Sequence, residues 1–312
     1  MAFPAELKPL SIVPGFRDGV GLGCAPIGNL FSPVTDADAV STVEAALALG
    51  VRFFDTAPLY GDGESERKLG VALHGVPRDE IVLATKVGRL LLDATGTPVN
   101  AGASGTSSVA DLSRDGVWRS LEGSLARLRT DRIDVVHLHD PLDVEAGLAG
   151  AMTALTELRS QGVVRAISVG LGQLDPLERF VAAAPLDVVM EAGRLTLLDR
   201  RAKDRLLPLA ASHGVRVIAA GVFNSGILAD PDAAPFFEYR QAEASVLQRA
   251  RRMQQLCREH GIELADAAVQ FPLRHGADAV VVGARTPAEV EAFVAGLAVD
   301  VPTPLWDALD EA

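Results

Sequence analysis

The segment Val51–Leu73, VRFFDTAPLYGDGESERKLGVAL, carries the pattern from which the fold can be inferred. It begins with an apolar run that ends at Asp55, which is typical of a buried parallel strand with a charged residue at its carboxyl end. A loop rich in proline and glycine follows and contains Tyr60. Glu64–Leu73 has acidic residues in its first turn and is predicted to be a helix. In parallel α/β folds the carboxyl end of a strand carries the chemistry, so Asp55 and Tyr60 are candidate functional residues.

Two later strand candidates also end at a residue able to take part in catalysis. The apolar run at 81–85 is followed by Lys86, and the run at 133–138 is followed by His139. Parallel neighbouring strands place their carboxyl ends on the same side of a sheet. We therefore expect Asp55, Tyr60, Lys86 and His139 to meet at one mouth.

Such a group has a specific proton-transfer chemistry. An unperturbed tyrosine has a pKa of about 10, too high for acid–base work near neutral pH. A neighbouring Lys86 ammonium favours the phenolate, so we expect the pKa of Tyr60 to fall below that value. Asp55 would hold the ammonium in place, and His139 would orient the same substrate oxygen by a hydrogen bond. Tyr60 would then exchange a proton with a carbonyl or hydroxyl oxygen.

Each of these residues has an ordinary explanation when it is taken alone. A single charged residue at a strand end is more often a helix cap or a surface charge, and Tyr60 alone could be an interface aromatic. Their joint occurrence on three successive strand ends favours the catalytic interpretation. His137 competes with His139, because a period of two directs both side chains the same way. We interpret His137 as a buried supporting histidine, since His139 lies at the strand end.

Apolar strands and amphipathic helices alternate over the whole chain and predict an α/β fold, a (β/α)₈ TIM barrel formed as a single domain by residues 1–312. The predicted strands are 20–26, 51–54, 80–86, 133–138, 163–169, 186–190, 215–220 and 278–282. The predicted helices are 36–49, 64–73, 115–129, 145–161, 199–213, 244–260, 264–275 and 287–297. Residues 1–19 are expected to form a short hairpin at the barrel floor, and residues 88–114 a long loop that covers substrate. The first strand, 20–26, is rich in glycine, and its tip is expected to let the cofactor or substrate approach the backbone closely.

FFDTAPLYGDGESERKLG, followed by ATK and later by LHDP, resembles the aldo-keto reductase family, whose members are NAD(P)-dependent enzymes on a (β/α)₈ barrel. The family's catalytic tetrad of Asp, Tyr, Lys and His falls on Asp55, Tyr60, Lys86 and His139. GLGCAPIGNLF, TKVGRLL, GVFNSGILA and VVVGARTPAEVE extend the likeness over nearly the whole chain. They are similar to the branch that contains D-threo-aldose (L-fucose) 1-dehydrogenases, plant L-galactose dehydrogenase and pyridoxal 4-dehydrogenase.

The resemblance also implies a cofactor, NAD or NADP, and places its contacts. A glycine followed by Arg285 and then Pro287 at the start of a helix leaves backbone N–H groups and a cation for phosphate. The family's Ser-Asn pair that binds the nicotinamide amide is replaced here by Gly170-Leu171. Arg285 could hold a 2′-phosphate or only the pyrophosphate, so the choice between NAD and NADP stays open. The candidate cofactor-binding residues are Gly170, Gln173, Gly221, Asn224, Ser225, Gly226, Gly283, Arg285 and Glu289.

The composition and charge of the chain exclude some classes of binding partner. The chain has 312 residues, 48% hydrophobic and 22% charged, with a formal net charge of −12. That charge argues against nucleic acid or an anionic membrane as a partner. Two cysteines are too few for a disulfide framework or a metal site. The sequence shows no leader and no apolar run long enough to span a membrane, so we expect a cytoplasmic monomer or small homo-oligomer.

The resemblance implies an oxidoreductase that acts on a small sugar or aldehyde. The branch favours oxidation of the anomeric carbon of an aldose, or of a similar cyclic hemiacetal, to a lactone. Reduction of a small aldehyde or ketone is the alternative within the family. A catalytically silent barrel that only binds cofactor, like the potassium-channel β subunits, is a second alternative. A metal-dependent barrel hydrolase is a third, although the sequence offers no ligand cluster beyond His137 and His139.

Overall fold

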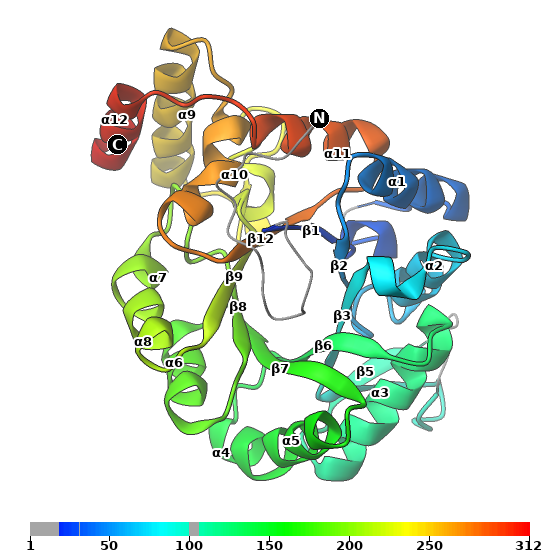
Figure 1. Ribbon diagram of the computed structural model, residues 1–312. Helices are drawn as coiled ribbons and strands as arrows, with labels where there is room; N and C mark the ends of the chain where they lie inside the picture. Colours follow the sequence, from blue (N-terminus) through cyan, green and yellow to red (C-terminus); the bar gives the residue numbers. More distant parts are fainter. Residues whose placement is uncertain (1–18, 31, 100–105) are drawn as a thin grey trace.

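The computed structural model describes residues 19–30, 32–99 and 106–312. Eight parallel strands close into a barrel in the order β1-β12-β9-β8-β7-β6-β3-β2, with helices around it (Figure 1). The predicted (β/α)₈ fold is therefore confirmed. The barrel strands are β1 (Val20–Gly23), β2 (Phe53–Asp55), β3 (Val82–Val87), β6 (Ile133–His139), β7 (Val164–Leu171), β8 (Val188–Ala192), β9 (Arg216–Ala220) and β12 (Ala279–Gly283). The hairpin expected within residues 1–19 lies outside the described residues.

The helices begin where the sequence provides caps. The side chains of Thr35, Ser113 and Thr286 each accept a hydrogen bond from a backbone N–H in the first turn of the following helix. The α-helices are α1 (Asp36–Ala48), α2 (Glu64–Ala72), α3 (Arg114–Leu128), α4 (Val144–Ala146), α5 (Met152–Ser160), α6 (Leu174–Ala183), α7 (Arg201–Asp204), α8 (Leu206–Ser212), α9 (Ala244–Glu259), α10 (Leu264–Arg274), α11 (Pro287–Gly296) and α12 (Thr303–Glu311). Among the described residues, no helix is both long and apolar enough to cross a membrane.

Two of the predicted helices are interrupted. The helix expected at 145–161 consists of α4, a π-helical turn at Gly147–Ala151, and α5. The helix expected at 199–213 is divided into α7 and α8 at Arg205, whose φ of −114° and ψ of −67° depart from helical values. α6 and α12 are not among the helices predicted from the sequence.

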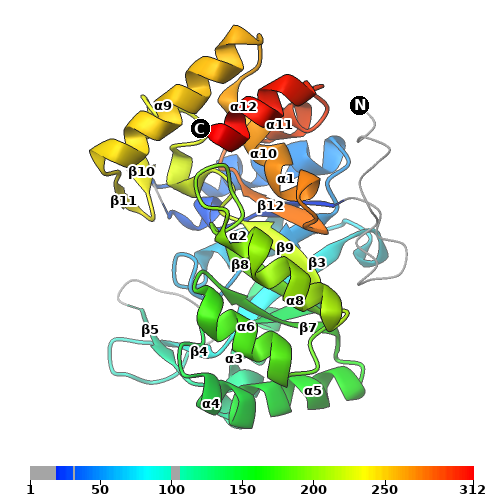
Figure 2. The same ribbon diagram turned by 90° about the vertical axis from the view of Figure 1, so that its left-hand side faces the viewer.

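The long loop expected at 88–114 contains a β-hairpin. β4 (Arg89–Leu92) pairs with β5 (Ser107–Ala110) in antiparallel register, while 100–105 lie outside the described residues. A second, smaller hairpin forms after β9, from β10 (Phe236–Phe237) and β11 (Arg240–Gln241). Figure 2 shows both hairpins at the same end of the barrel. They flank the mouth formed by the carboxyl ends of the strands.

The apolar interior of the barrel explains one glycine of the first strand. The interior is filled by a separate cluster that includes Phe53, Val135, Met190 and Ile218. A Cβ atom on Gly21 would lie 2.5 Å from the Phe53 ring, so the glycine makes room for this side chain. Packing is therefore the reason for glycine at this position, and the expectation that the tip of the strand admits a ligand stays a prediction.

Three aspartates at the amino ends of strands share one arrangement. Each carboxylate accepts a hydrogen bond from a backbone N–H of the neighbouring strand and pairs with an arginine. The groups are Asp134 with Leu83 N and Arg78, Asp187 with Ile167 N and Arg159, and Asp278 with Val217 N and Arg216. Charge-assisted bonds of this kind tie adjacent strands together. These groups therefore stabilise the barrel at the end opposite the mouth.

Candidate active site

The strand register brings the sequence-predicted catalytic residues to one end of the barrel. Asp55 is the last residue of β2, Lys86 lies one residue before the end of β3, and His139 ends β6. Across the sheet, Asp55 pairs with Gly23, which pairs in turn with Gly283 on the other side. The side chains of Asp55, Lys86 and His139 are buried.

Lys86 is the centre of the cluster. Its Nζ atom donates to Asp55 Oδ1 at 2.8 Å, to Asp55 Oδ2 at 2.6 Å and to the Thr56 carbonyl at 3.0 Å. The same Nζ lies 4.9 Å from the centroid of the Tyr60 ring. The Tyr60 and His139 rings meet edge to face, with centroids 5.8 Å apart. The structure therefore brings together all four residues that the sequence predicted as a tetrad.

The electrostatics of Tyr60 differ from the sequence expectation. Burial raises the pKa of Tyr60 to about 12, although the charge of Lys86 acts to lower it. The expectation of a pKa below 10 is therefore wrong. Burial by itself would lower the pKa of Lys86. The interactions of Lys86 with Asp55 and Tyr60 raise it, and together they exceed the effect of burial, so the pKa of Lys86 is raised. Lys86 is thus held as an ammonium beside a protonated phenol.

The two histidines of β6 have different surroundings. Burial first, and then the charges of Lys86 and Arg89, keep the pKa of His139 well below its ordinary value, so its imidazole is neutral. His137 is fully buried, with Nδ1 2.7 Å from Ser168 Oγ and Nε2 3.5 Å from Asp55 Oδ1. His137 therefore supports the cluster from inside the barrel, and His139 faces the mouth beside Tyr60.

The loop that carries Tyr60 is held by close backbone packing. A Cβ atom on Gly61, whose φ is 63°, would lie 2.0 Å from the Gly28 carbonyl oxygen. Ser65 Oγ donates to the Cys24 carbonyl at 2.7 Å and lies 2.8 Å from Thr56 Oγ1. Glycine is required at this contact, and the result is a fixed position for the Tyr60 backbone.

A buried ion pair fixes α2, the helix after this loop. Glu66 Oε1 accepts a hydrogen bond from Thr85 Oγ1 at 2.6 Å, and Glu66 Oε2 accepts one from Arg127 Nε at 2.6 Å. Thr85 is the neighbour of Lys86, and Arg127 belongs to α3. The pair therefore locks α2 to β3 and α3, directly behind the cluster.

The segment after β9 is a compact turn with an unusual backbone. Gly221, Asn224, Ser225 and Gly226 all have positive φ, at 64°, 45°, 66° and 109°. Asn224 N donates to the Gly221 carbonyl at 2.8 Å and Gly226 N to the Phe223 carbonyl at 3.0 Å, so these N–H groups hold the turn itself. Asn224 is buried; its Nδ2 donates to the Gly193 carbonyl at 3.3 Å, but its Oδ1 has no hydrogen-bond partner among the described residues. The Asn224 Oδ1 atom can therefore accept a hydrogen bond from a ligand, and the contacts of this segment with a dinucleotide stay predictions.

Arg285 and Glu289 face each other at the start of α11. Arg285 Nε donates to Glu289 Oε1 at 3.0 Å, and the Arg285 backbone N–H donates to Glu289 Oε2 at 2.8 Å. Both side chains are about two-fifths exposed, at 42% and 41%. Gly283 and Gly170 lie at the carboxyl ends of β12 and β7, and Gln173 precedes α6. All nine predicted cofactor residues are therefore on the mouth side, and their roles remain predictions.

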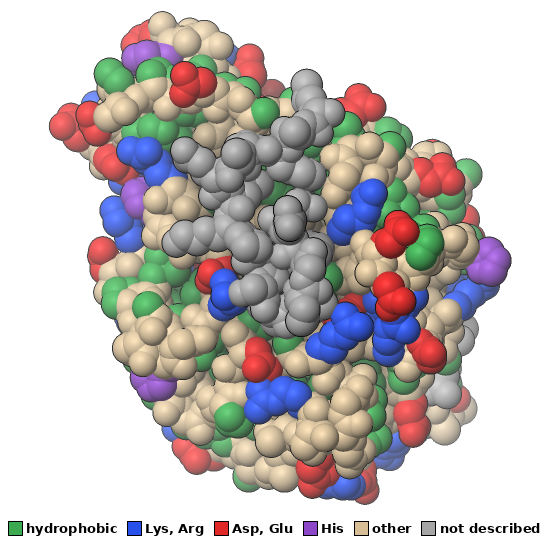
Figure 3. Space-filling view, in the orientation of Figure 1, with side chains coloured by type: hydrophobic (Ala, Val, Ile, Leu, Met, Phe, Trp, Pro, Cys, Tyr) green, Lys and Arg blue, Asp and Glu red, His purple; other side chains and the backbone are tan. Residues whose placement is uncertain are grey.

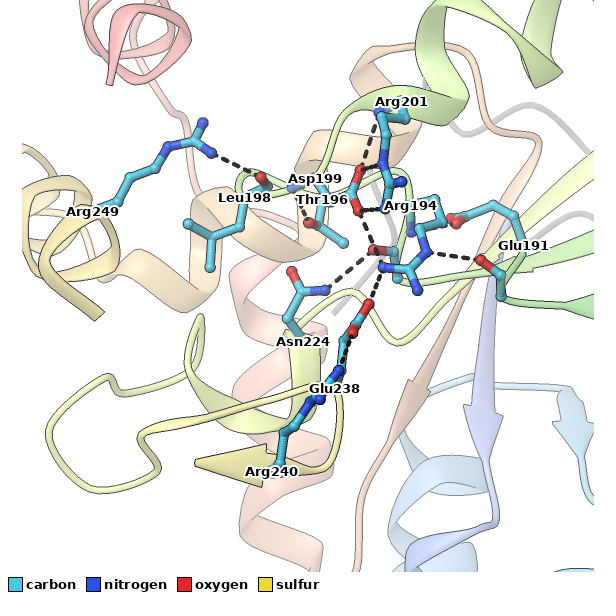
Figure 4. A network of polar contacts seen from close by, with 12 residues as sticks. Glu191, Arg194, Thr196, Leu198, Asp199, Arg201, Asn224, Glu238, Arg240 and Arg249 are labelled. Carbon is cyan, nitrogen blue, oxygen red and sulfur yellow. Dashed lines mark hydrogen bonds and ion pairs between the residues drawn. The ribbon is translucent and has the colours of Figure 1, made fainter. Parts of the chain in front are cut away.

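Arg194, which was not predicted from the sequence, joins three loops at the mouth. Arg194 Nε donates to the Gly172 carbonyl at 2.7 Å, and Arg194 Nη1 pairs with Asp199 at 3.1 Å and with Glu238 (Figure 4). Its backbone N–H donates to Glu191 Oε2 at 2.7 Å. Arg194 thus connects the loops after β7, β8 and β9. An arginine in a polar loop carries no sequence signal for this, because the partners in the other two loops, Gly172 and Glu238, are distant in the chain.

The mouth contains further acidic side chains besides Asp55. Asp140 follows His139 with a φ of 46°, and its carboxylate lies 3.7 Å from His139 Nε2. Its place directly after His139 in LHDP is a signal that could have identified it. Within the described part of the chain, no group of three or more His, Cys, Asp or Glu side chains is arranged to hold a metal ion.

Comparison with known proteins supports these observations. Residues 19–312 match the family model described as the aldo/keto reductase family. A D-threo-aldose 1-dehydrogenase of Pseudomonas sp. is 40% identical over 306 residues, covering 94% of this chain and 93% of the relative. A pyridoxal 4-dehydrogenase of Microbacterium luteolum is 36% identical over 316 residues, covering 93% and 92%. An L-galactose dehydrogenase of Arabidopsis thaliana is 31% identical over 303 residues, covering 94% and 88%.

A solved structure shares the fold. A glycerol dehydrogenase of Gluconobacter oxydans superimposes with a TM-score of 0.77 at 25% identity, covering 100% of this chain and 94% of the other. The match of sequence over the barrel and the match of fold agree with the resemblance seen in the motifs. The chain therefore belongs to the aldo/keto reductase family and is an NAD(P)-dependent oxidoreductase.

Proposed function

We propose that this enzyme oxidises the anomeric carbon of an aldose, or of a similar cyclic hemiacetal, to a lactone. The observation that carries the proposal is the contact of Lys86 with Asp55 and Tyr60 beside a neutral His139. The three relatives above act, by their names, on an aldose, on pyridoxal and on L-galactose. Their shared chemistry supports a sugar-like substrate here.

Each residue of the cluster has a role in this reaction. The neutral His139 imidazole donates a hydrogen bond to the anomeric oxygen and positions it against Tyr60. The anomeric C–H bond breaks with its electron pair, the hydroxyl proton passes to the Tyr60 oxygen, and the lactone carbonyl forms. A bound nicotinamide supplies the hydride acceptor. Lys86 stabilises the phenolate that accepts the proton, and Asp55 keeps the Lys86 ammonium aimed at it.

We also propose that the enzyme prefers NAD to NADP. Glu289 accepts a hydrogen bond from Arg285 Nε, and its carboxylate would add negative charge beside a 2′-phosphate if Arg285 were to hold one. Like charges at such distances disfavour binding. Arg285 retains donors for a pyrophosphate oxygen, since a guanidinium offers five N–H groups.

A substrate panel with both nucleotides tests the proposal. Aldoses, pyridoxal and open-chain aldehydes are offered with NAD and with NADP, nicotinamide absorbance is followed, and the lactone is identified in the product. Tyr60→Phe is expected to lose about 10²–10⁴-fold in kcat because it removes the proton acceptor. Its affinity for the reduced nucleotide, measured by fluorescence, should be retained. Turnover of open-chain aldehydes alone, or a Tyr60→Phe enzyme within a few fold of wild type, would contradict the proposal.

A further inference from the structure

Asp140 follows the last residue of β6, and its side chain does not point where strand geometry would direct it. Successive side chains of a strand point to opposite faces, so the residue after His139 would face away from the mouth. The φ of Asp140 is instead 46°, and its Oδ2 atom lies 3.7 Å from His139 Nε2. The change of backbone direction therefore brings the Asp140 carboxylate alongside the His139 imidazole.

The backbone of Asp140 is held on both sides. Its N–H donates to the Gly170 carbonyl of β7 at 3.0 Å, and the buried Pro141 restricts the conformation of the residue before it. A positive φ is uncommon outside glycine and has a cost in backbone energy, so it persists only where the surroundings impose it. Residues held in this way concentrate at active sites and ligand sites. The Asp140 carboxylate therefore has a defined position at the mouth.

The Asp140 carboxylate is accessible to a ligand. Its side chain is 49% exposed, and its distance from the neutral His139 imidazole is too long for a hydrogen bond. Burial of the remaining part raises the pKa of this carboxyl, while the charges of Lys86 and Arg89 favour its ionised form. An ionised carboxylate offers only acceptors, so a ligand must bring an N–H or O–H group to it.

We propose that Asp140 is a specificity-determining residue that accepts a hydrogen bond from the 2-hydroxyl group of the aldose. In the reaction proposed above, His139 binds the anomeric oxygen. The anomeric carbon has two neighbours in the sugar ring, which are the ring oxygen and C2. The ring oxygen carries no hydrogen and cannot donate to a carboxylate, so the hydroxyl group on C2 is the donor nearest to the reacting centre.

The distance between the two protein groups fits this arrangement. The oxygens on C1 and C2 of a cyclic sugar lie within hydrogen-bond reach of each other. Two protein groups 3.7 Å apart can therefore hold both oxygens at once, with His139 Nε2 on the first and Asp140 Oδ2 on the second. The inference rests on the proposed function, because it takes the anomeric oxygen as the group that His139 binds.

The test compares an aldose with its 2-deoxy analogue in wild type, Asp140→Gly and Asp140→Asn. Glycine removes the carboxylate and adopts a positive φ without strain, whereas asparagine keeps the shape of the side chain and a neutral acceptor. In Asp140→Gly, kcat/KM for the aldose should fall roughly 10- to 100-fold, the range of a hydrogen bond to a charged group, and that for the 2-deoxy analogue less than about threefold. Asp140→Asn should lie between wild type and Asp140→Gly.

Two controls separate this role from a general disturbance of the mouth. The 2-hydroxyl group also affects the intrinsic reactivity of the anomeric carbon, so the ratio of the two kcat/KM values is compared between enzymes. Glu145→Gln removes a carboxylate of α4 that is 79% exposed and should leave this ratio and both kcat/KM values unchanged. Affinity for the reduced nucleotide, measured by fluorescence, should equal that of wild type in all three variants.

The outcomes distinguish this inference from the proposed function. If wild type forms lactones but Asp140→Gly loses activity equally with both substrates, or keeps the wild-type kcat/KM for the aldose, the role of Asp140 is refuted and the proposed function stands. Should Asp140→Gly fail to fold, the ratio in Asp140→Asn decides, and a ratio equal to that of wild type refutes the role. If wild type turns over no cyclic substrate, the proposed function and this inference fail together.

Discussion

Tyr60 is subject to two opposing effects of its surroundings. Removal from water favours the neutral phenol, whereas the Lys86 ammonium favours the phenolate. Burial is the larger effect, and the pKa of Tyr60 rises to about 12. Oxidation requires the phenolate form, so dehydrogenase activity should increase with pH and reduction should decrease. The charge of Lys86 limits how far burial raises the pKa of Tyr60.

The chain offers a direct measurement of this balance. It contains two tyrosines, Tyr60 and Tyr239, so ultraviolet titration of tyrosinate resolves only two groups. In Tyr239→Phe the remaining signal belongs to Tyr60, and it should appear well above the ordinary value of about 10. Adding Lys86→Met, which removes the charge and keeps much of the volume, should move it higher still. A Tyr60 titration at or below 10, or no shift with Lys86→Met, would contradict the assigned role of Lys86.

At the residue scale, the sequence located the cluster but not its electrostatics. Asp55, Lys86 and His139 could be found because each follows an apolar run, and the end of a strand has a defined place in a parallel barrel. The pKa of Tyr60 depends on how much water the packed loops exclude, which the pattern of residues does not encode.

At the element scale, the sequence predicted strands and helices with strong periodicity and missed those without it. β5 is SSVA and mostly exposed, so it lacks the alternation that marks a half-buried strand. It is defined by pairing with β4 across a long loop. β10 is only two residues long and depends on the contacts of its turn. These hairpins shape the mouth, which is why sequence alone does not identify the substrate.

Arg194 is predicted to control the order of the β10–β11 hairpin. Arg194→Gln removes the charge-assisted bonds to Glu238 and Asp199, each contributing about 1.5–3 kcal/mol. The turn of this hairpin is formed by Glu238 and Tyr239, which both have positive φ, and it should therefore open more often. Amide hydrogen exchange in 236–241 should accelerate roughly tenfold or more. Arg240→Gln is the matched control, because Arg240 pairs with the same Glu238 but is 78% exposed, and exposed pairs contribute little. Equal exchange in both variants would show that Arg194 does not anchor the hairpin.

At the scale of the whole molecule, the two ends of the barrel have different tasks. The amino ends hold the aspartate–arginine groups that join neighbouring strands. Figure 3 shows the face opposite the two hairpins, where acidic and basic side chains are intermixed around the rim. The carboxyl ends also bury polar groups that lack a hydrogen-bond partner on one atom among the described residues, such as Asn224 and Glu191. The aspartate–arginine groups at the amino ends stabilise the fold, whereas buried groups such as Glu191 at the carboxyl ends reduce its stability.

The effect of the buried Glu191 carboxyl group on stability can be measured as a pH dependence of the free energy of unfolding. Burial raises its pKa from the model-peptide range to about 8, and one of its oxygens has no hydrogen-bond partner among the described residues. A group with a raised pKa stabilises the fold fully below its unfolded pKa, about 4.3 for Glu, and this contribution is lost as the pH rises toward the folded value. Wild type should therefore lose free energy of unfolding between about pH 5 and about pH 8, with a slope of at most about 1.4 kcal/mol per pH unit from this group.

Glu191→Gln isolates this effect, because the amide has the shape of the neutral acid and can still accept the Arg194 N–H bond. Its free energy of unfolding in urea should approach and then exceed that of wild type as the pH increases across this window. Glu44→Gln, on the exposed side of α1, removes the same charge without burial and should track wild type at every pH. A constant difference between wild type and Glu191→Gln would mean that Glu191 is already ionised in the folded protein. The Arg194 guanidinium would then have to compensate a buried carboxylate, and the mouth would carry one more negative charge than its geometry implies.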